Sequence, residues 1–201
     1  MKSRMYNIFL FLSTLTRGLV SVFSLVLLYK MGYSFRDILY FLFVLYSVGI
    51  LVNYLSLRIY YKIVLVLSSL IYGFSFIYLL SMDNSIINLS IFAVMLSFGE
   101  YSYHAMRHYL ALVMLEDNKK KSINLVLINY LGVIISSLIG VLLIEKLSNL
   151  VTSIIIFIMS FISLLPVLRQ DSNLLKKRDS DVRVSIPTNK IIFNMLEQFK
   201  V

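Results

Sequence analysis

Residues 63–81 read IVLVLSSLIYGFSFIYLLS and contain no charged side chain. An α-helix needs about 20 consecutive apolar residues to cross the hydrocarbon core of a bilayer. The run therefore predicts a transmembrane helix, which is preceded by Arg58 and Lys62 and followed by Asp83. A transmembrane β-barrel would instead show short segments of alternating polarity, and this run is continuous.

Similar apolar runs fill most of the chain on both sides of this stretch. We therefore predict an all-α polytopic membrane protein whose six transmembrane helices form one bundle over residues 1–168. The predicted spans cover residues 6–29, 38–57, 63–81, 86–115, 123–144 and 150–168. Hydrophobic residues make up 59% of the 201 positions and charged residues 14%, a balance that excludes an ordinary soluble domain.

Basic residues are distributed unequally between the two predicted sides of the membrane. Thirteen lie on the side that holds both termini, and three lie on the other side. Lys and Arg resist translocation, so the basic side is expected to be cytoplasmic. The abundance of Ile, Leu, Tyr, Lys and Asn fits an AT-rich bacterial genome. We thus predict a multi-pass protein of a bacterial cytoplasmic membrane with cytoplasmic N and C termini. The net charge of +9 is expected to set the orientation of the protein in the lipid bilayer, and we expect no binding of nucleic acid.

The chain changes character after the sixth predicted span. Residues 169–190 are polar and basic and are expected to form a cytoplasmic loop. Residues 191–201 are apolar again and fit two alternatives, an amphipathic helix on the membrane surface or the start of a truncated seventh span. We favour the second, because the segment follows a long basic loop and a complete set of six spans.

Six spans with cytoplasmic ends and a long basic loop after them resemble the N-terminal half of a major facilitator superfamily transporter. In that family the loop between spans two and three reads approximately G-x-x-x-D-R-x-G-R-K. The corresponding residues here, 53–62, read NYLSLRIYYK. Arg58 and Lys62 match the basic positions of the motif, whereas Leu57 replaces its acidic residue and Tyr60 its second glycine.

A second local resemblance lies in the fifth predicted span. Antiporter members of the family carry G-x-x-x-G-P-x-x-G there, and residues 132–140 read GVIISSLIG. Gly132 and Gly140 keep the outer glycines, and Ser136 and Ser137 replace the central pair. Small residues at this spacing allow helices to approach closely in lipid, so we interpret the segment as a helix-packing motif.

Arg17 lies near the middle of the first predicted span. On insertion scales an Arg at the centre of a span costs about 2.5–3.5 kcal/mol, so its presence requires an explanation. One interpretation is that Arg17 contacts an anion or carboxylate of a solute in a central cavity. The other is that it pairs with a carboxylate or with carbonyl groups at a helix end.

The fourth predicted span contains an ionisable stripe. At 100° per residue, Glu100, His104 and Arg107 fall on one narrow face, with His108 at its edge. This face predicts either a proton relay or charged-solute site, or a structural ion pair of Glu100 with Arg107 or Arg17. Histidine titrates near physiological pH, which suits proton coupling. Deeper aromatic residues either line a cavity or pack in the core, namely Tyr72, Phe74, Phe76, Tyr101 and Tyr103.

Sequence patterns for catalysis and for cofactor binding are missing from the chain. It has no cysteine, and it contains no H-E-x-x-H metal motif, no G-x-S-x-G nucleophile motif and no phosphate-binding loop. We therefore expect no enzymatic activity, no metal site and no cofactor.

The resemblance implies one half of a secondary transporter that moves a small-molecule substrate across the membrane, with protons as the expected coupling ion. Substrate would bind between two six-helix halves, so the chain is expected to be inactive without a second half, in the same or a separate polypeptide. The candidate residues for substrate contact or proton coupling are Arg17, Glu100, His104 and Arg107. Two alternatives stay open: a stand-alone substrate-binding subunit of an energy-coupling importer, and a membrane protein that does not transport.

Overall fold

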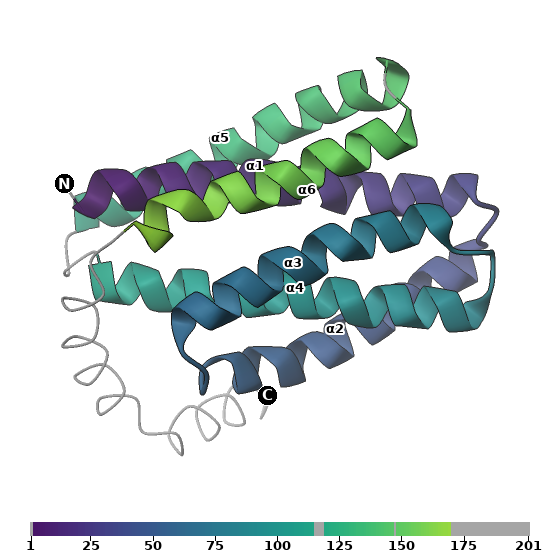
Figure 1. Ribbon diagram of the computed structural model, residues 1–201, viewed down its shortest axis with the longest axis horizontal. Helices are drawn as coiled ribbons and strands as arrows, with labels where there is room; N and C mark the ends of the chain where they lie inside the picture. Colours follow the sequence, from purple (N-terminus) through teal and green to yellow (C-terminus); the bar gives the residue numbers. More distant parts are fainter. Residues whose placement is uncertain (1, 115–118, 147, 170–201) are drawn as a thin grey trace, which may run out of the picture.

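The computed structural model describes residues 2–114, 119–146 and 148–169, which form one bundle of six helices (Figure 1). The helices are α1 (Lys2–Lys30), α2 (Phe35–Ser56), α3 (Tyr61–Ser81), α4 (Ile86–Met114), α5 (Lys119–Lys146) and α6 (Asn149–Leu168). No strand occurs in these residues, so the all-α prediction is confirmed for the described part of the chain.

Five helices, α1 to α4 and α6, contain apolar stretches long enough to cross a membrane. These helices indicate insertion into a membrane. α5 has a shorter apolar segment, Leu125–Gly140, so the sixth crossing stays a prediction, as does the orientation of the bundle. Apart from Arg169, the predicted basic loop (169–190) and the apolar tail (191–201) lie outside the described residues.

The helices extend past the apolar runs by a few residues. α1 already begins at Lys2 and α5 at Lys119, because lysine favours helical backbone and continues the helix beyond the apolar segment. α2 begins more sharply. The hydroxyl of Ser34 accepts the backbone N–H of Asp37 at 3.3 Å, and the Asp37 carboxylate accepts the backbone N–H of Ser34 at 2.9 Å. This reciprocal capping box fixes the first turn of α2.

Packing in the bundle follows the pattern of an inverted repeat of three helices. α1 packs mainly on α5 and α6, α4 packs mainly on α2 and α3, and α3 also packs on α6. If α1, α2 and α3 are exchanged with α4, α5 and α6, the α1–α5 pair becomes α4–α2 and the α1–α6 pair becomes α4–α3, whereas the α3–α6 pair becomes itself. α1 and α4 run in opposite directions, so the two sets of three helices are inverted relative to each other (Figure 1).

The start of α1 and the end of α6 lie at the same end of the bundle (Figure 1). We call it the basic end, because Arg58, Lys62 and Arg169 lie there, together with the first turn of α5, which begins with three lysines. The other end, called the opposite end, holds the α1–α2 and α3–α4 connections. Tyr33 joins these two connections, because its hydroxyl accepts the backbone N–H of Ser85 at 3.1 Å.

The apolar core forms two clusters, one toward each end of the bundle. The cluster toward the opposite end includes Phe23, Phe76 and Phe92, and the cluster toward the basic end includes Phe9 and Leu110. The middle of the bundle lies between them, and Arg17 of α1 and Glu100 of α4 are placed there. The fold therefore surrounds its central polar groups with apolar packing above and below.

Candidate functional site

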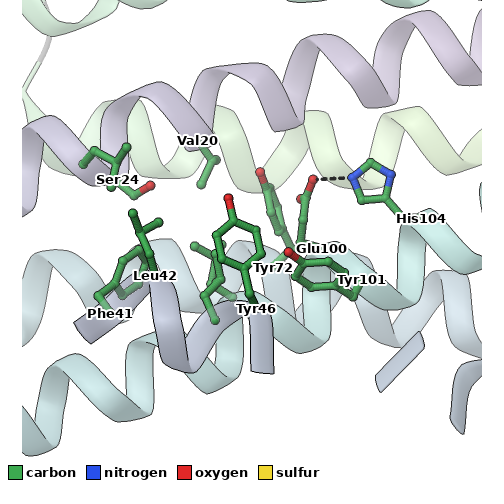
Figure 2. Close-up of a pocket in the computed structure, with 12 residues that line it drawn as sticks. Val20, Ser24, Phe41, Leu42, Tyr46, Tyr72, Glu100, Tyr101 and His104 are labelled. Carbon is green, nitrogen blue, oxygen red and sulfur yellow. Dashed lines mark hydrogen bonds and ion pairs between the residues drawn. The ribbon is translucent and has the colours of Figure 1, made fainter. Parts of the chain in front are cut away.

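The central polar site contains two residues of the ionisable stripe on α4, Glu100 and His104. Glu100 and His104 are one helical turn apart, and the Glu100 Oε1 and His104 Nε2 atoms lie 2.9 Å from each other (Figure 2). The His104 side chain is 37% exposed and the Glu100 side chain 25% exposed, so the pair is open on one side. A proton or a polar solute can therefore reach this carboxylate.

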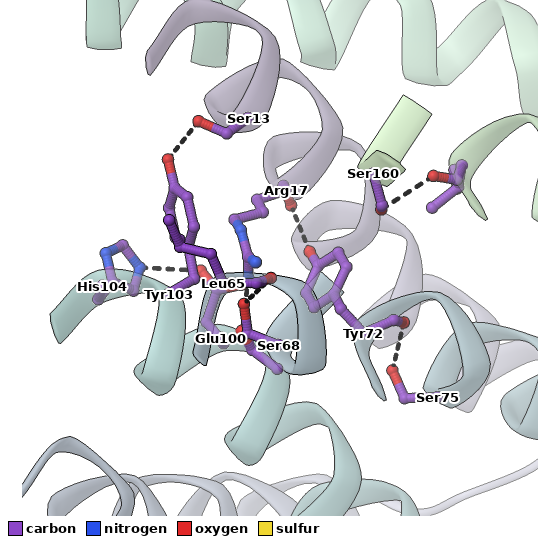
Figure 3. Close-up of polar contacts among 12 residues, drawn as sticks. Ser13, Arg17, Leu65, Ser68, Tyr72, Ser75, Glu100, Tyr103, His104 and Ser160 are labelled. Carbon is purple, nitrogen blue, oxygen red and sulfur yellow. Dashed lines mark hydrogen bonds and ion pairs between the residues drawn. The ribbon is translucent and has the colours of Figure 1, made fainter. Parts of the chain in front are cut away.

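Arg17 of α1 binds the other oxygen of the same carboxylate. Its Nη1 atom lies 2.9 Å from Glu100 Oε2 and donates also to the backbone carbonyl oxygen of Gly99, again at 2.9 Å (Figure 3). The Arg17 side chain is only 9% exposed. Glu100 is thus shared between a buried guanidinium on one oxygen and a half-exposed imidazole on the other.

Two aromatic rings enclose the guanidinium. The Arg17 carbon Cζ lies 3.8 Å from the centre of the Tyr103 ring and 4.4 Å from the centre of the Tyr72 ring. Cation–π attraction of this kind contributes on the order of 1–2 kcal/mol per contact when it is shielded from water. The rings therefore replace part of the hydration that Arg17 loses in the bundle.

Both rings are themselves held by hydrogen bonds to α1. The Tyr72 hydroxyl donates to the backbone carbonyl oxygen of Arg17 at 3.1 Å, and the Tyr103 and Ser13 hydroxyls share a hydrogen bond (Figure 3). Tyr72 comes from α3 and Tyr103 from α4. The side chains of Glu100, Tyr72 and Tyr103 consequently hold the guanidinium in one position, and Ser13 holds Tyr103.

A cavity of about 300 Å³ adjoins this network between α1, α2 and α4. Glu100 and His104 line it near the middle of the bundle, and Ser24 of α1 and Phe41 of α2 line it further toward the opposite end (Figure 2). Arg17 is not among the lining residues. The cavity therefore presents the carboxylate and the imidazole to an entering molecule, with the guanidinium behind them.

Arg107 belongs to a separate network nearer the basic end. Its Nη1 atom donates to Asn129 Oδ1 of α5 at 2.9 Å, and the hydroxyl of Thr14 donates to the same oxygen at 3.1 Å. The Tyr6 hydroxyl donates to the backbone carbonyl oxygen of Arg107 at 3.0 Å. Of the two partners considered for Glu100 from the sequence, Arg17 is the one that pairs with it. His108 is exposed beside this network.

The two family-like segments lie away from the cavity. The Arg58 guanidinium donates to the Tyr54 hydroxyl, and its Cζ atom lies 4.5 Å from the centre of the same ring. In α5, Gly132 and Gly140 face Thr14 and Phe23 of α1. Small size at these α5 positions thus permits close contact with α1.

The serines between those glycines differ in their surroundings. Ser136 is buried against Gly18 of α1, where a side chain on Gly18 would overlap the Ser136 hydroxyl. Ser137 is less buried and donates to the carbonyl oxygen of Val133 at 3.0 Å. Ser136 therefore belongs to the α1–α5 contact, and Ser137 satisfies its hydroxyl within its own helix.

Asn129 and Tyr46 are site residues that the sequence analysis missed. Asn129 is a polar amide in an otherwise apolar run, and this isolation was a usable signal, since polar groups inside a bundle need partners. Tyr46 lines the cavity from α2 and lies with its ring centre 6.4 Å from that of Tyr101. Tyr46 lies inside the second predicted span and away from its ends, and this position was a usable signal as well.

Metal-binding geometry is missing from the described side chains, because no three or more His, Asp or Glu residues gather closely enough among them. Comparison with known proteins finds no family model, no curated protein and no solved structure that matches the chain.

Proposed function

We propose that this chain is one six-helix half of a secondary transporter of the major facilitator type, which moves a small solute across a bacterial cytoplasmic membrane. The observation that carries the proposal is the Arg17–Glu100–His104 network beside a cavity, halfway along α1 and α4. Ionisable residues inside a membrane are costly and as a rule serve a solute or proton pathway.

Helix packing supports the choice of transporter class. Each six-helix half of a major facilitator transporter contains two inverted repeats of three helices, with the substrate site near the midplane. In this bundle the packing of α1 on α5 and α6 matches the packing of α4 on α2 and α3, as expected for two such repeats. Arg17 and Glu100 lie near the middle of α1 and α4, the two first helices of the repeats.

A second six-helix bundle is proposed to cover the open side of the network. His108 is exposed, and His104 and Arg107 are half-buried. Lipid cannot hydrogen-bond such groups, so a protein partner or a water-filled space has to face them. The second bundle belongs to the same or a separate polypeptide, and the isolated chain is then inactive.

Proton coupling is proposed to act at Glu100 and His104, which form the accessible part of the network. Protonation of Glu100 would remove the charge that holds Arg17 and His104 together. The basic end would face the cytoplasm, because Lys and Arg resist translocation and thirteen of the basic residues are predicted from the sequence to be on that side.

The proposal is tested by proton flux in everted membrane vesicles from the source organism, with the chromosomal gene intact or carrying Glu100→Gln. A pH-sensitive dye records proton movement after each member of a panel of small solutes is added. We expect a solute that moves protons with the native gene and not with Glu100→Gln, while the exposed-loop variant Asp83→Asn retains the response. Equal responses in the native and Glu100→Gln vesicles would contradict the assignment of Glu100.

A stand-alone substrate-binding subunit is the second candidate, and one observation favours it. Side chains from four helices of this single bundle line the cavity, so a solute can contact them without a second half. Such a subunit would require an ATPase partner for uptake, because the chain has no phosphate-binding loop of its own. Uptake that stops on ATP depletion while the proton gradient persists would select this candidate.

A further inference from the structure

The lining of the cavity between α1, α2 and α4 is unusual in its combination of groups. Three tyrosines, Tyr46, Tyr72 and Tyr101, lie around the carboxylate of Glu100 (Figure 2). Phe41 adds a fourth ring toward the opposite end. Aromatic rings carry negative charge on their faces, so rings and carboxylate together attract positive charge.

The charges are placed so that an entering molecule meets the carboxylate first. Glu100 lines the cavity, whereas Arg17 approaches the carboxylate from the far side and lies between two rings. The Arg17 Nη1 atom donates to the Glu100 carboxylate and to the Gly99 carbonyl oxygen. An anion in the cavity would therefore be repelled by the Glu100 carboxylate, while the Arg17 guanidinium is held on the far side of that carboxylate.

The second oxygen of Glu100 is held by a group that can be displaced. His104 makes a 2.9 Å contact with Oε1, and its side chain is 37% exposed. A ligand cation can take the place of the imidazole at this oxygen without disturbing Arg17 on the other one. In low-dielectric surroundings such a contact between opposite charges is stronger than in water.

We propose that this cavity binds a small organic cation, an ammonium group attached to an apolar or aromatic body. The ammonium group lies against Glu100 and the tyrosine rings, and the body extends between Phe41 and Ser24 toward the opposite end. The volume of about 300 Å³ is at the lower limit for ligand pockets, which selects a molecule with one ring or a short chain. The inference deepens the proposed function by naming the class of solute.

Equilibrium dialysis of the purified full chain in a neutral detergent tests the proposal. The probe is radiolabelled benzyltrimethylammonium, with protein-free micelles as the blank. Benzyl alcohol and benzoate, which share the ring and lack the positive charge, are the competitors. We expect saturable binding of the probe, competition by unlabelled probe, and none by benzoate. Absence of saturable binding, or equal competition by benzoate, would overturn the proposal.

Two variants locate the binding site. Glu100→Gln should weaken probe binding at least tenfold, whereas Asp83→Asn, which removes an exposed carboxylate outside the cavity, should leave it unchanged. Unchanged affinity in Glu100→Gln would place any binding elsewhere and overturn the assignment.

Tyr46→Leu guards against a variant that simply fails to fold. Tyr46 is 57% exposed and is no part of the Arg17 network, so its replacement should preserve the helical circular dichroism of the chain. Loss of the ring should weaken binding roughly threefold or more. Intact affinity in a folded Tyr46→Leu variant would count against this cavity.

The assay separates this inference from the proposed function, because binding by the isolated chain needs neither a second bundle nor a gradient. Probe binding without any proton flux in vesicles would keep the cation site and reject the transporter. Solute-driven flux without probe binding would keep the transporter and reject an organic cation as its solute.

Discussion

Arg17 and Glu100 form an ion pair across the centre of the bundle, with 2.9 Å between Nη1 and Oε2. Arg17 lies near the middle of α1 and Glu100 near the middle of α4. α1 packs mainly on α5 and α6, and α4 packs mainly on α2 and α3. The pair adds a direct link between these two helices, which are the first helices of the two three-helix sets. A change in its protonation or ligation would alter this link.

Breaking this pair should destabilise the bundle strongly. Arg17→Gln and Glu100→Gln should each lower the free energy of unfolding by about 3 kcal/mol, because each leaves the remaining residue of the pair inside the bundle without the opposite charge. The double variant should lose less than the sum of the two, because it leaves no isolated charge. Circular dichroism during titration of dodecyl maltoside micelles with sodium dodecyl sulfate measures these energies. Asp83→Asn, in an exposed connection, should change stability by less than about 0.5 kcal/mol.

Additive losses in that double-variant cycle would show that Arg17 and Glu100 do not interact in the folded protein. A small loss in Arg17→Gln would indicate instead that water reaches the pair and compensates both charges.

Gly18 should tolerate no side chain while Ser136 is present. A methyl group at Gly18 would overlap the Ser136 side chain, so Gly18→Ala should cost about 1–3 kcal/mol of stability. The same substitution in a Ser136→Gly background should cost close to nothing, because the overlapping atoms are gone. The same micelle titration provides the measurement.

Gly132→Ala is the matched control for this contact. Its new methyl carbon would lie 3.1 Å from Thr14 Cβ, a tighter but more tolerable approach, so it should cost less than Gly18→Ala. If Ser136→Gly gave no rescue, the close contact between α1 and α5 would be contradicted.

The cavity should contain water, and the absence of native cysteine makes this easy to measure. Tyr46→Cys places a thiol in the cavity wall, and Phe43→Cys places one on α2 outside the lining. Methanethiosulfonate reagents react with thiolates, which form only where water reaches the sulfur. Tyr46→Cys should be labelled at least tenfold faster than Phe43→Cys. Equal slow labelling of both would indicate a dry cavity.

The orientation set by the basic residues can be tested in intact cells. Asp83→Cys lies in the α3–α4 connection at the opposite end, and Ile59→Cys lies in the α2–α3 connection at the basic end. If the basic end is cytoplasmic, a membrane-impermeant maleimide should label only Asp83→Cys in intact cells and only Ile59→Cys in everted vesicles. The reverse pattern would invert the bundle and place the cavity on the cytoplasmic side.

The sequence predicts the helices well because each apolar run has charged or polar breaks on both sides. It also singles out Arg17, Glu100 and His104, since charge inside an apolar run is conspicuous. The choice between Arg17 and Arg107 as partner of Glu100 could not be made, because it depends on how α1 and α4 are rotated about their axes. The helices are apolar nearly all round, so the sequence gives little indication of that rotation.

The same limit explains why the aromatic surroundings of the site were not assigned. Tyr72 and Tyr103 were expected either to line a cavity or to pack in the core. Tyr72 does both and also stacks on Arg17, whereas Tyr103 stacks on Arg17 without lining the cavity. These roles arise where three helices meet, and no local pattern in α3 or α4 encodes them.

Tyr33 should make the stability of the opposite end sensitive to alkaline pH. Burial raises the pKa of the Tyr33 hydroxyl above 10, and this hydroxyl accepts the Ser85 backbone N–H. The folded chain therefore keeps this proton when the unfolded chain begins to lose it. The contribution of Tyr33 to stability is complete below pH 10 and disappears as pH rises through the folded-state pKa.

Tyr33→Phe should cost about 1 kcal/mol at pH 7, because the hydrogen bond to Ser85 is lost. Between pH 9 and 11 its unfolding free energy should fall less steeply than that of the native chain, since the variant has no hydroxyl to ionise at this position. Micelle titrations at several pH values measure how the unfolding free energy of the native chain and that of Tyr33→Phe depend on pH. The other tyrosines contribute equally to both dependences. Parallel slopes would mean that Tyr33 ionises as easily in the folded chain as in the unfolded one, and would contradict its burial between the two connections.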